Sequence, residues 1–528
     1  MADAPRSRFW SGRHAGILVP LFSIPSRRSW GIGEIPDLVP LAKWLAEAGL
    51  DFVQFLPMNE MQAGQSSPYS ALSAMAIDPI YIAVEAVEDW RVDPVFSDDD
   101  RALLERARKE PRVDYGAVRA LKGRALRRAF GRFRDTVAGR DGDRDRRFRE
   151  FQDHERWWLD DYSLFRALLE ENGGRHWRDW EPGVRNRVPS ALVEARQRLR
   201  DEIAFYAYLQ WLAGEQWHEA RRAADPVGLF GDFPFMVSSH SADVWARQHE
   251  FDIDASVGTP PDAFSETGQD WGLPPYRWDV VRAGNFGWLR ERARRSSALY
   301  DGYRIDHLIG FFRTYVRKPG AEPGFWPADE ADQRAMGEEL LTLFLESGAS
   351  LIGEDLGTVP DFLRETLARR GVPGMKVLRW EREWTAPDKP FIDPDTYAAV
   401  SAATSGTHDT ETMADWWDAA DEDERRAIAA IPSLRPLQIS EKSGFTDGIR
   451  DALLGALFGA GSQLLILPIQ DIFGWRDRVN VPALISDVNW SWRLPGPVED
   501  MLTDSGGRER AGFLADLSRR TGRFPSHS

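Results

Sequence analysis

The segment YRIDHLI, residues 303–309, joins a short apolar run to an ionisable side chain, and seven other short apolar runs punctuate the chain. Each run ends in Gly, Pro or a polar cluster, as buried strands commonly do. The eight runs are residues 16–22, 52–56, 229–235, 303–309, 350–353, 375–378, 399–404 and 463–468. Segments with helical spacing, such as 38–48 and 336–347, separate most of them. Alternating strands and helices predict a parallel sheet, and eight strands favour a closed (β/α)₈ barrel, the α/β architecture called a TIM barrel.

One long segment departs from this alternation. Residues from approximately 85 to 220 are charged and rich in helix formers, with few strand signals. Residues 119–133 and 190–220 have the spacing of amphipathic helices. We therefore expect one catalytic barrel over residues 1–528, with a largely helical insertion at 85–220.

The composition excludes several classes of function. A formal net charge of −16 argues against a nucleic-acid or anionic-membrane partner, because either would require a basic face. The chain has no cysteine, so disulfides, thiolate catalysis and Cys-ligated metals are excluded. No histidines follow a ligand spacing such as HExxH, and no acidic cluster resembles a calcium loop, so we expect no metal and no cofactor.

The sequence also gives an expectation for the location of the protein. The opening residues, MADAPRSRFWSGRHAG, contain basic residues but lack the apolar core of a signal peptide. Apolar runs such as 463–469 are too short to cross a bilayer. A cytoplasmic location is therefore expected, whereas the sequence does not indicate an oligomeric state.

Three carboxylates follow predicted strands. Asp306, Glu354 and Asp409 come after the fourth, fifth and seventh strand, and the C-terminal strand ends of a barrel converge on one mouth. Two acids about 5 Å apart suit a retaining glycosidase, and a third can stabilise its transition state. His307 and His408 flank the two Asp residues and could donate to substrate hydroxyls. For each residue alone, a helix cap, a salt bridge or a structural histidine is the competing interpretation.

Neighbouring charges predict how two of these acids ionise. Arg304 lies two residues before Asp306 and points the same way along a strand. Such an Arg would keep Asp306 ionised, as a nucleophile requires. Asp355 follows Glu354 directly and would raise the pKa of Glu354 if the two carboxylates are close.

Eight motifs resemble those of amylomaltases, which are also called 4-α-glucanotransferases or disproportionating enzymes. In order they are SSPYSALSA (66–74), GDFPFMVSSHSADVW (231–245), PPDAFSETGQDWGLPPYRWD (260–279), RIDHLIG (304–310), GEDLGTV (353–359), PGMKVL (373–378), GTHDTET (406–412) and NWSWRL (489–494). The opening GILVPLFSIPSRRSWGIGEIPDL fits the same pattern. The resemblance therefore runs from about residue 16 to about residue 494.

This resemblance implies a (β/α)₈ barrel with inserted helical subdomains, no C-terminal β-sandwich, and transfer of α-1,4-glucan segments by a retaining double displacement. It implies that Asp306 is the nucleophile, Glu354 the general acid/base and Asp409 the transition-state stabiliser. Substrate contacts are implied for Tyr69, Asp232, Trp271, Arg304, His307, Asp355 and His408. Among these, Tyr69 would stack on a sugar and Trp271 would lie on a loop over the acceptor side.

Departures from the family pattern lie around the acceptor side. Ala263 replaces the first residue of an aromatic pair, Leu273 stands where Asn is usual, and LIGFFRTYVRKPG (308–320) replaces a longer segment. They put the acceptor preference and the balance of transfer against hydrolysis in question. An α-amylase-like hydrolase with the same carboxylates is the alternative, and a non-catalytic glucan-binding protein a further one. The short charged tail beyond Trp492 favours the transferase, because amylases of this mechanism commonly carry a C-terminal β-domain and a calcium site.

Overall fold

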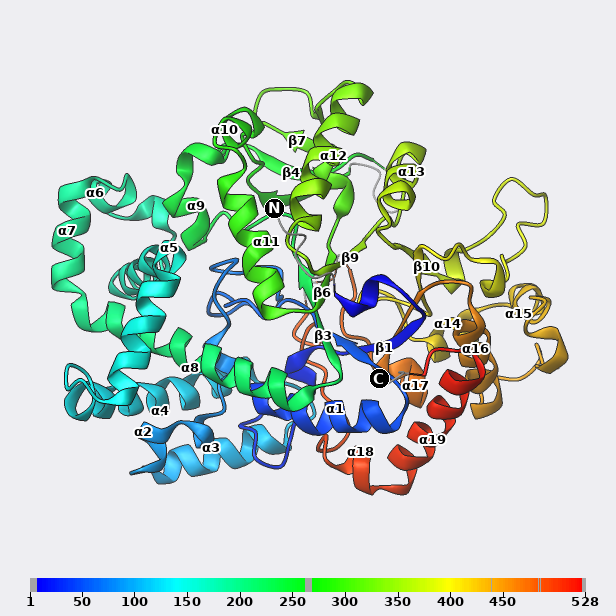
Figure 1. Ribbon diagram of the computed structural model, residues 1–528, viewed down its shortest axis with the longest axis horizontal. Coiled ribbons are helices and arrows are strands. Elements are labelled where there is room, and N and C mark those ends of the chain that lie inside the picture. The colour runs from blue at the N-terminus through cyan, green and yellow to red at the C-terminus, as the bar shows by residue number, and fades with distance from the viewer. Residues whose placement is uncertain (1–6, 262–267, 438, 483, 485, 525–528) are drawn as a thin grey trace.

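The computed structural model describes residues 7–261, 268–437, 439–482, 484 and 486–524, and eight parallel strands close into a barrel at its centre (Figure 1). The barrel strands are β1 (His14–Leu18), β2 (Phe52–Gln54), β3 (Gly228–Phe233), β6 (Gly302–Ile305), β9 (Ser350–Gly353), β10 (Gly374–Val377), β11 (Ser401–Thr404) and β12 (Leu464–Pro468). They follow one another around the barrel in chain order, and β12 pairs with β1 to close it. The predicted (β/α)₈ barrel is confirmed.

Several predicted strands end too late. The run 303–309 forms a strand only as far as Ile305, and 229–235 only as far as Phe233. After β6, His307 has a left-handed backbone (φ 47°, ψ 52°) and Leu308–Phe311 form a 3₁₀ turn. Apolar residues resume after both strands, with Leu308 and Ile309 after β6 and Phe235 after β3, so composition alone hides the point at which the backbone leaves the strand.

The barrel interior explains the runs of apolar residues. Every residue of β12 is buried, because strands of a helix-covered parallel sheet are enclosed on both faces. Phe9, Phe52 and Phe230 form a ring cluster inside, with centroids 4.6 to 5.7 Å apart. A Cβ atom on Gly16 would lie 2.4 Å from the carbonyl oxygen of Phe52 and 2.7 Å from its ring. Glycine on β1 therefore leaves room for an aromatic side chain of the neighbouring strand.

Helices surround the barrel, and those between β2 and β3 form the group at the left of Figure 1. This group comprises α2 (Glu88–Arg91), α3 (Asp98–Lys109), α4 (Tyr115–Thr136), α5 (Asp143–Glu171), α6 (Pro182–Arg185), α7 (Pro189–Arg198) and α8 (Arg200–Ala224). The single helix expected over 190–220 is wrong, because the chain leaves helical geometry at Leu199 (φ −102°, ψ 21°) between α7 and α8.

The other helices connect or flank the remaining strands. They are α1 (Leu38–Glu47), α9 (Ala242–Ala246), α10 (Trp278–Ala283), α11 (Gly287–Leu299), α12 (Glu330–Leu345), α13 (Asp361–Arg370), α14 (Met413–Ala419), α15 (Glu422–Ala429), α16 (Asp447–Gly459), α17 (Ile469–Phe473), α18 (Asp500–Thr503) and α19 (Ser505–Arg520). In the part of the chain that the structure describes, only loops and helices follow β12, so no C-terminal β-sandwich is present there. Of the helices in the same described part, none is long and apolar enough to cross a membrane.

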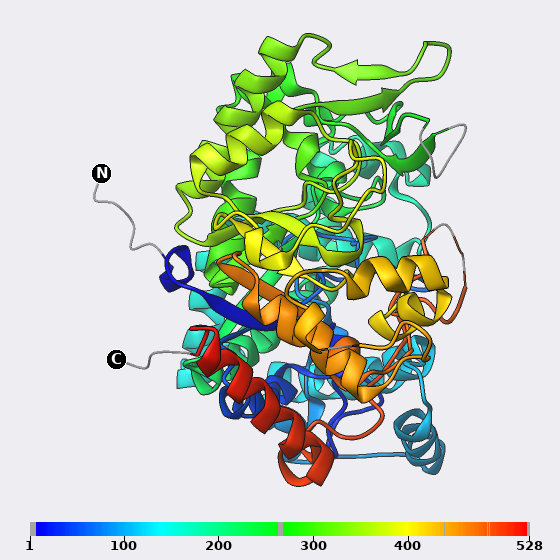
Figure 2. The same ribbon diagram turned by 90° about the vertical axis from the view of Figure 1, so that its right-hand side faces the viewer.

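A second, antiparallel sheet was not predicted. It contains β5 (Gln269–Leu273), β4 (Ser256–Thr259), β7 (Thr314–Arg317) and β8 (Gly324–Trp326), in that order. In Figure 2 the hairpin of β7 and β8 (green) lies at the opposite end of the molecule from α19 (red). The segment 308–320, which departs from the family pattern, contributes β7 to this sheet. Trp326 stacks on Trp278 at 6.3 Å with an interplanar angle of 8°, which attaches the sheet to α10.

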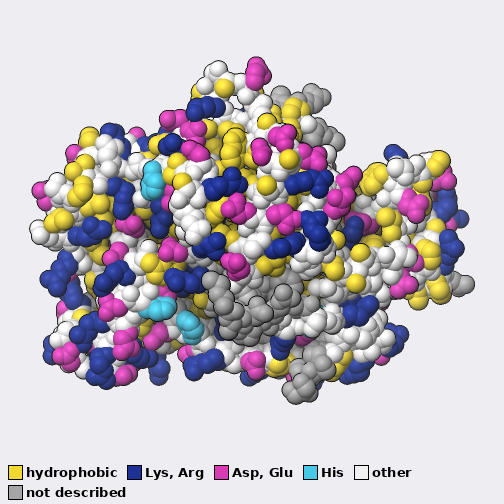
Figure 3. Space-filling model, turned by 45° about the horizontal axis from the view of Figure 1, so that its top comes forward, with side chains coloured by type: hydrophobic (Ala, Val, Ile, Leu, Met, Phe, Trp, Pro, Cys, Tyr) yellow, Lys and Arg dark blue, Asp and Glu magenta, His cyan; other side chains and the backbone are white. Residues whose placement is uncertain are grey.

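Acidic and basic side chains alternate over the surface. Figure 3 shows them interspersed across one face of the molecule. Many form ion pairs on exposed helices, for example Arg334 with Glu330 on α12. Such pairs contribute little stability individually. Because both signs of charge are interspersed, the net charge of −16 is not gathered into one patch on this face.

Arg523 fastens the end of the chain to the underside of the barrel. Its side chain is fully buried, and its guanidinium donates at 2.7 to 3.2 Å to the carbonyl oxygens of His14, Phe458, Ala460, Ser462 and Gln463. These carbonyls lie at the start of β1 and before β12. Burial, and secondarily Arg13, lower the pKa of Arg523 to about 9.

We expect Arg523→Met to lower the free energy of unfolding by about 3 kcal/mol or more, because several buried carbonyl groups lose their donor. Thermal unfolding followed by circular dichroism measures the effect. The matched control is Arg520→Met, since Arg520 and Asp516, both on α19, form an exposed ion pair. Equal effects of the two substitutions would contradict this assignment.

Candidate active site

The C-terminal ends of four barrel strands bring the predicted site residues together. Asp232 is the penultimate residue of β3, and Arg304 lies in β6. Asp306 follows β6 directly, and Glu354 follows β9 directly. Because parallel strands of a barrel end on the same rim, residues separated by more than a hundred positions share one mouth. Asp409 joins them from the turn after β11.

Arg304 is the centre of the site. Its Nε and Nη2 atoms donate to the two oxygens of Asp232 at 3.0 and 2.7 Å. Nη2 also donates to Asp306 Oδ1 at 2.8 Å, and Nη1 donates to Glu354 Oε2 at 2.9 Å. A further bond runs from Nη2 to the hydroxyl of Tyr69 at 3.0 Å. The Arg304 side chain is 4% exposed, so one buried cation holds three carboxylates.

The Tyr69 ring connects this cluster to the turn after β11. Its hydroxyl donates to Asp232 Oδ2 at 2.6 Å and lies 3.2 Å from His408 Nε2. The two rings are stacked, with centroids 5.5 Å apart and an interplanar angle of 22°. His408 Nε2 is in turn 3.3 Å from Asp409 Oδ2. Tyr69 is therefore fixed by both its hydroxyl and its ring face.

The chain is similar to known proteins over nearly its whole length. A family model described as 4-alpha-glucanotransferase matches residues 19–499. The chain belongs to the 4-alpha-glucanotransferase family. A 4-alpha-glucanotransferase of Thermus thermophilus is 32% identical over 96% of this chain and 99% of its own length, and one of Chlamydia pneumoniae is 30% identical over 94% and 95%. The amylomaltase from Streptococcus agalactiae in complex with acarbose has a TM-score of 0.82 and 26% identity, covering 97% of this chain and 100% of its own.

The two acids at the centre of this glucanotransferase site have pKa values shifted in opposite directions. Burial raises the pKa of Asp306 well above its usual value, and the Glu354 carboxylate adds to this, whereas Arg304 opposes it. Burial also acts to raise the pKa of Glu354, but Arg304 and the His307 N–H, 2.8 Å from Oε2, outweigh it and the pKa is lowered. In the free protein Asp306 is therefore protonated more readily than Glu354. Arg304 lowers the pKa of Asp306, as expected, but burial and the Glu354 carboxylate outweigh it, so the expectation of an ionised Asp306 is not met in the free protein.

Asp409 has a different environment. Burial acts to raise its pKa, but His408, a bond from Asn480 and the charge of Arg304 outweigh burial and lower the pKa. The Asn480 bond, from Nδ2 to Asp409 Oδ1, is 2.6 Å long. Asp409 is thus held as a carboxylate on the same rim as Asp306 and Glu354.

Asp355 does not join the cluster through its hydrogen bonds. Its carboxylate accepts the N–H of Met375 at 2.7 Å and lies 3.4 Å from Arg364. The pKa of Glu354 is lowered, by Arg304 first and then by the His307 N–H, and is not raised as we expected if Asp355 were close. Adjacency in sequence misled here, because successive side chains after a strand point in different directions.

Trp271 and His307 meet on the side of the second sheet. Trp271 lies on β5, and its ring contacts the His307 ring edge-on at 4.8 Å and 84°. Burial lowers the pKa of His307, which favours a neutral ring. Leu273 lies on the same strand as Trp271, whereas Ala263 lies outside the described residues. Among the described residues, no group of three or more His, Cys, Asp or Glu side chains could hold a metal ion.

Two supporting residues, Asn480 and Trp490, were missed by the sequence analysis. The Trp490 ring lies 5.7 Å from the rings of both Tyr69 and His408. Its backbone is left-handed (φ 61°), which is unusual for a bulky residue, and its carbonyl accepts the hydroxyl of Tyr115 on α4 at 2.7 Å. The motif NWSWRL contains Trp490, but only the fold shows what its ring supports.

We expect Arg304→Met to lower the free energy of unfolding by about 3–5 kcal/mol, because it leaves buried carboxylates without a cation. Without Arg304 these acids have a higher pKa folded than unfolded, so the loss shrinks as pH falls and they become protonated. Thermal unfolding at about pH 8 and about pH 5 measures this difference. Arg334→Met, on an exposed face of α12, is the control. A loss of the same size at both pH values would show that Arg304 does not hold these charges.

Proposed function

We propose that this glucanotransferase moves segments of α-1,4-glucan to the 4-hydroxyl of another glucan or of glucose, with retention of configuration. The observation that carries the proposal is the contact of one guanidinium, that of Arg304, with both Asp306 and Glu354 at the barrel mouth. Membership of the 4-alpha-glucanotransferase family supports the substrate class. The crystal structure of the Streptococcus agalactiae amylomaltase in complex with acarbose supports the same choice.

In the first half of the proposed reaction, Glu354 protonates the glycosidic oxygen while Asp306 attacks the anomeric carbon. The glycosidic C–O bond breaks, the reducing-end fragment leaves as an alcohol, and the rest of the glucan stays bound covalently to Asp306. The proton must then be on Glu354, although in the free protein it favours Asp306. A glycosidic oxygen placed beside Glu354 accepts its hydrogen bond and so favours the protonated form of that acid. The contact of Arg304 with Asp306 stabilises the carboxylate that attacks.

In the second half, Glu354 acts as a base. It removes the proton from the 4-hydroxyl of the acceptor, whose oxygen displaces Asp306 from the anomeric carbon, and the second inversion restores the α linkage. The ionised Asp409, held by Asn480, stabilises the positive charge that develops on the sugar ring. A bound acceptor competes with water because orientation raises its effective concentration.

The binding roles follow from the same geometry. We assign contacts with the donor sugar to Tyr69, Asp232 and His408, which form one hydrogen-bonded group beside the acids. Trp271, against His307, is assigned to the acceptor side. Asp355 stays a predicted substrate contact.

Two further assignments belong to this proposal. We treat residues 85–220 as a helical subdomain inserted into a single barrel, supported by the run of helices from α2 to α8. The cytoplasmic location stays a prediction, based on the composition of the first residues.

Chemical rescue distinguishes the roles of Asp306 and Glu354. With an α-maltotriosyl fluoride donor, whose leaving group needs no protonation, azide should give the β-glycosyl azide with Asp306→Ala and the α-glycosyl azide with Glu354→Ala. The first product forms by one inversion and the second by two. Without azide, Asp306→Ala should lose at least about 10³-fold in transfer from maltotriose. An α-azide from Asp306→Ala would refute the nucleophile assignment.

Maltotriose alone separates transfer from hydrolysis. We expect a ladder of shorter and longer sugars with glucose, at a constant number of reducing ends, because each transfer breaks and forms one α-1,4 bond. Chromatography and a reducing-end assay on the same samples provide the measurement. A steady rise in reducing ends would instead identify the α-amylase-like hydrolase. No change with a folded protein would indicate a non-catalytic glucan-binding protein.

A further inference from the structure

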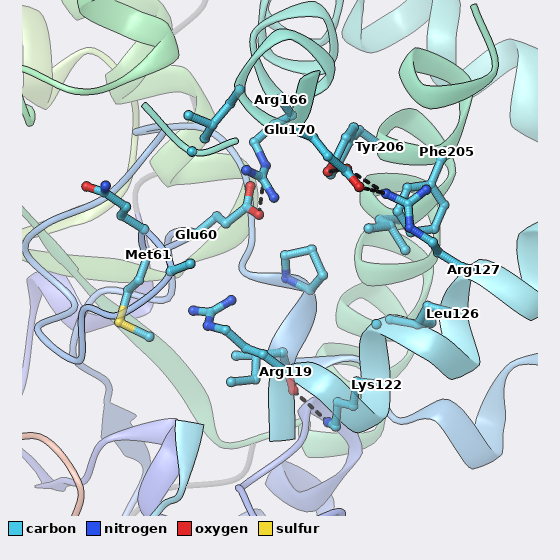
Figure 4. A pocket seen from close by; sticks show the side chains of 18 of the residues that line it. Glu60, Met61, Arg119, Lys122, Leu126, Arg127, Arg166, Glu170, Phe205 and Tyr206 are labelled. Atoms are coloured by element: carbon cyan, nitrogen blue, oxygen red, sulfur yellow. Dashed lines mark hydrogen bonds and ion pairs between the residues drawn. The ribbon is translucent and has the colours of Figure 1, made fainter. Parts of the chain in front are cut away.

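A cavity of about 540 Å³ lies within the helical group between β2 and β3 (Figure 4). It is bounded by α4, α5 and α8 and by the segment that contains Glu60 and Met61. Its lining includes none of the residues that form the active site. A volume of this size is typical of sites for small organic molecules.

Arg166 enters this cavity with unused donors. Its Nε lies 3.0 Å from Glu60 Oε1, and its guanidinium lies over the Tyr206 ring at 4.6 Å. Among the described residues, no oxygen accepts a hydrogen bond from this guanidinium, since the Nε contact with Glu60 is an ion pair without hydrogen-bond geometry, and the side chain is 18% exposed. The guanidinium is therefore fixed by a carboxylate and an aromatic face while its outer edge is free.

The other cations of the cavity are already occupied. Arg119 forms an ion pair with Asp78 at 2.7 Å. Lys122 is paired with Glu34, and Arg127 with both Glu170 and Glu202. In Figure 4 the Arg127 group lies on the opposite side of the cavity from Arg166 and Glu60. Arg166 is thus the cation of this lining, within the described chain, whose terminal donors remain available.

Glu60 repels a ligand anion less strongly than a permanently ionised carboxylate would. Burial raises the pKa of Glu60, against the opposing effect of Arg166, and its other oxygen accepts the hydroxyl of Tyr162 at 2.5 Å. A carboxyl group in such surroundings can take up a proton when a second anion approaches Arg166. The competition between Glu60 and a ligand anion is reduced in this way.

The remaining side chains of the lining indicate which kind of ligand body fits the cavity. Apolar side chains cover much of it: Met61, Pro79, Ile80, Leu126, Leu169 and Leu209. The faces of Phe205 and Tyr206 are covered by the guanidinium groups of Arg127, at 4.3 Å, and of Arg166. The cavity therefore offers no open aromatic face of the kind on which a sugar ring stacks.

We propose that this cavity is a binding site for a small organic anion, whose carboxylate or phosphate group bonds the terminal nitrogens of Arg166 and whose apolar body fills the space between α4, α5 and α8. A planar guanidinium recognises both groups by paired hydrogen bonds. The site is independent of glucan transfer and does not rest on the function proposed above.

Two glycines of α4 provide the test. Gly123 lines the cavity, and a Cβ atom there would meet nothing within 4 Å, so Gly123→Leu fills the cavity without disturbing an ion pair. Gly131 lies on the same helix outside the lining and has the same open space, so Gly131→Leu is the matched control. Arg166→Lys keeps the charge but removes the planar group.

The probes are benzoate, phenyl phosphate, inorganic phosphate, benzyl alcohol and maltose, studied by calorimetry and saturation-transfer NMR with the full-length protein. We expect benzoate or phenyl phosphate to bind the wild type and Gly131→Leu, and to lose about tenfold or more in affinity with Gly123→Leu and Arg166→Lys. Inorganic phosphate and benzoate distinguish a phosphate head from a carboxylate head. The proposal is overturned if neither organic anion binds, if binding survives Gly123→Leu, or if benzyl alcohol or maltose binds there equally well.

Discussion

A single desolvated cation, Arg304, holds the active site together. Asp232, Asp306 and Glu354 approach it from three strands, and three carboxylates so close could not remain buried without a shared counter-charge. Each nitrogen of the guanidinium has an assigned acceptor, so Arg304 fixes directions as well as charge. The fold meets this requirement, because the closed barrel brings the C-terminal ends of these strands to one rim.

The group of acids around Arg304 also shows what the sequence could and could not predict. The eight strands and the barrel follow from apolar runs separated by helical segments. The meeting of Asp306, Glu354 and Asp409 follows from their positions after three of those runs. The position of the proton does not follow, because the burial that raises the pKa of Asp306 and the His307 N–H that lowers the pKa of Glu354 are properties of the fold. The neighbour of Glu354, Asp355, illustrates the same limit, since its bond to Met375 is a property of the fold.

The remaining differences arise from contacts between distant segments. The antiparallel sheet joins strands from two separate loops, each too short to be distinguished from irregular structure by its own pattern. Asn480 and Trp490 support Asp409, Tyr69 and His408, although neither has a titratable side chain that would attract attention. Tyr115 links α4 of the helical group to Trp490, so that group contacts the rim on which the acids lie.

The fastening of Arg523 beneath the barrel has a consequence for biosynthesis. The cylinder closes by pairing its first strand with its last, Gly16 with Ile466, and the residue that bonds the carbonyls at that seam lies further still along the chain. A nascent polypeptide emerging from the ribosome therefore holds β1 without its partner β12 until residues 464–468 have been translated. Sheet edges left open in this way are prone to association with other chains, so β1 stays open to such association until β12 pairs with it.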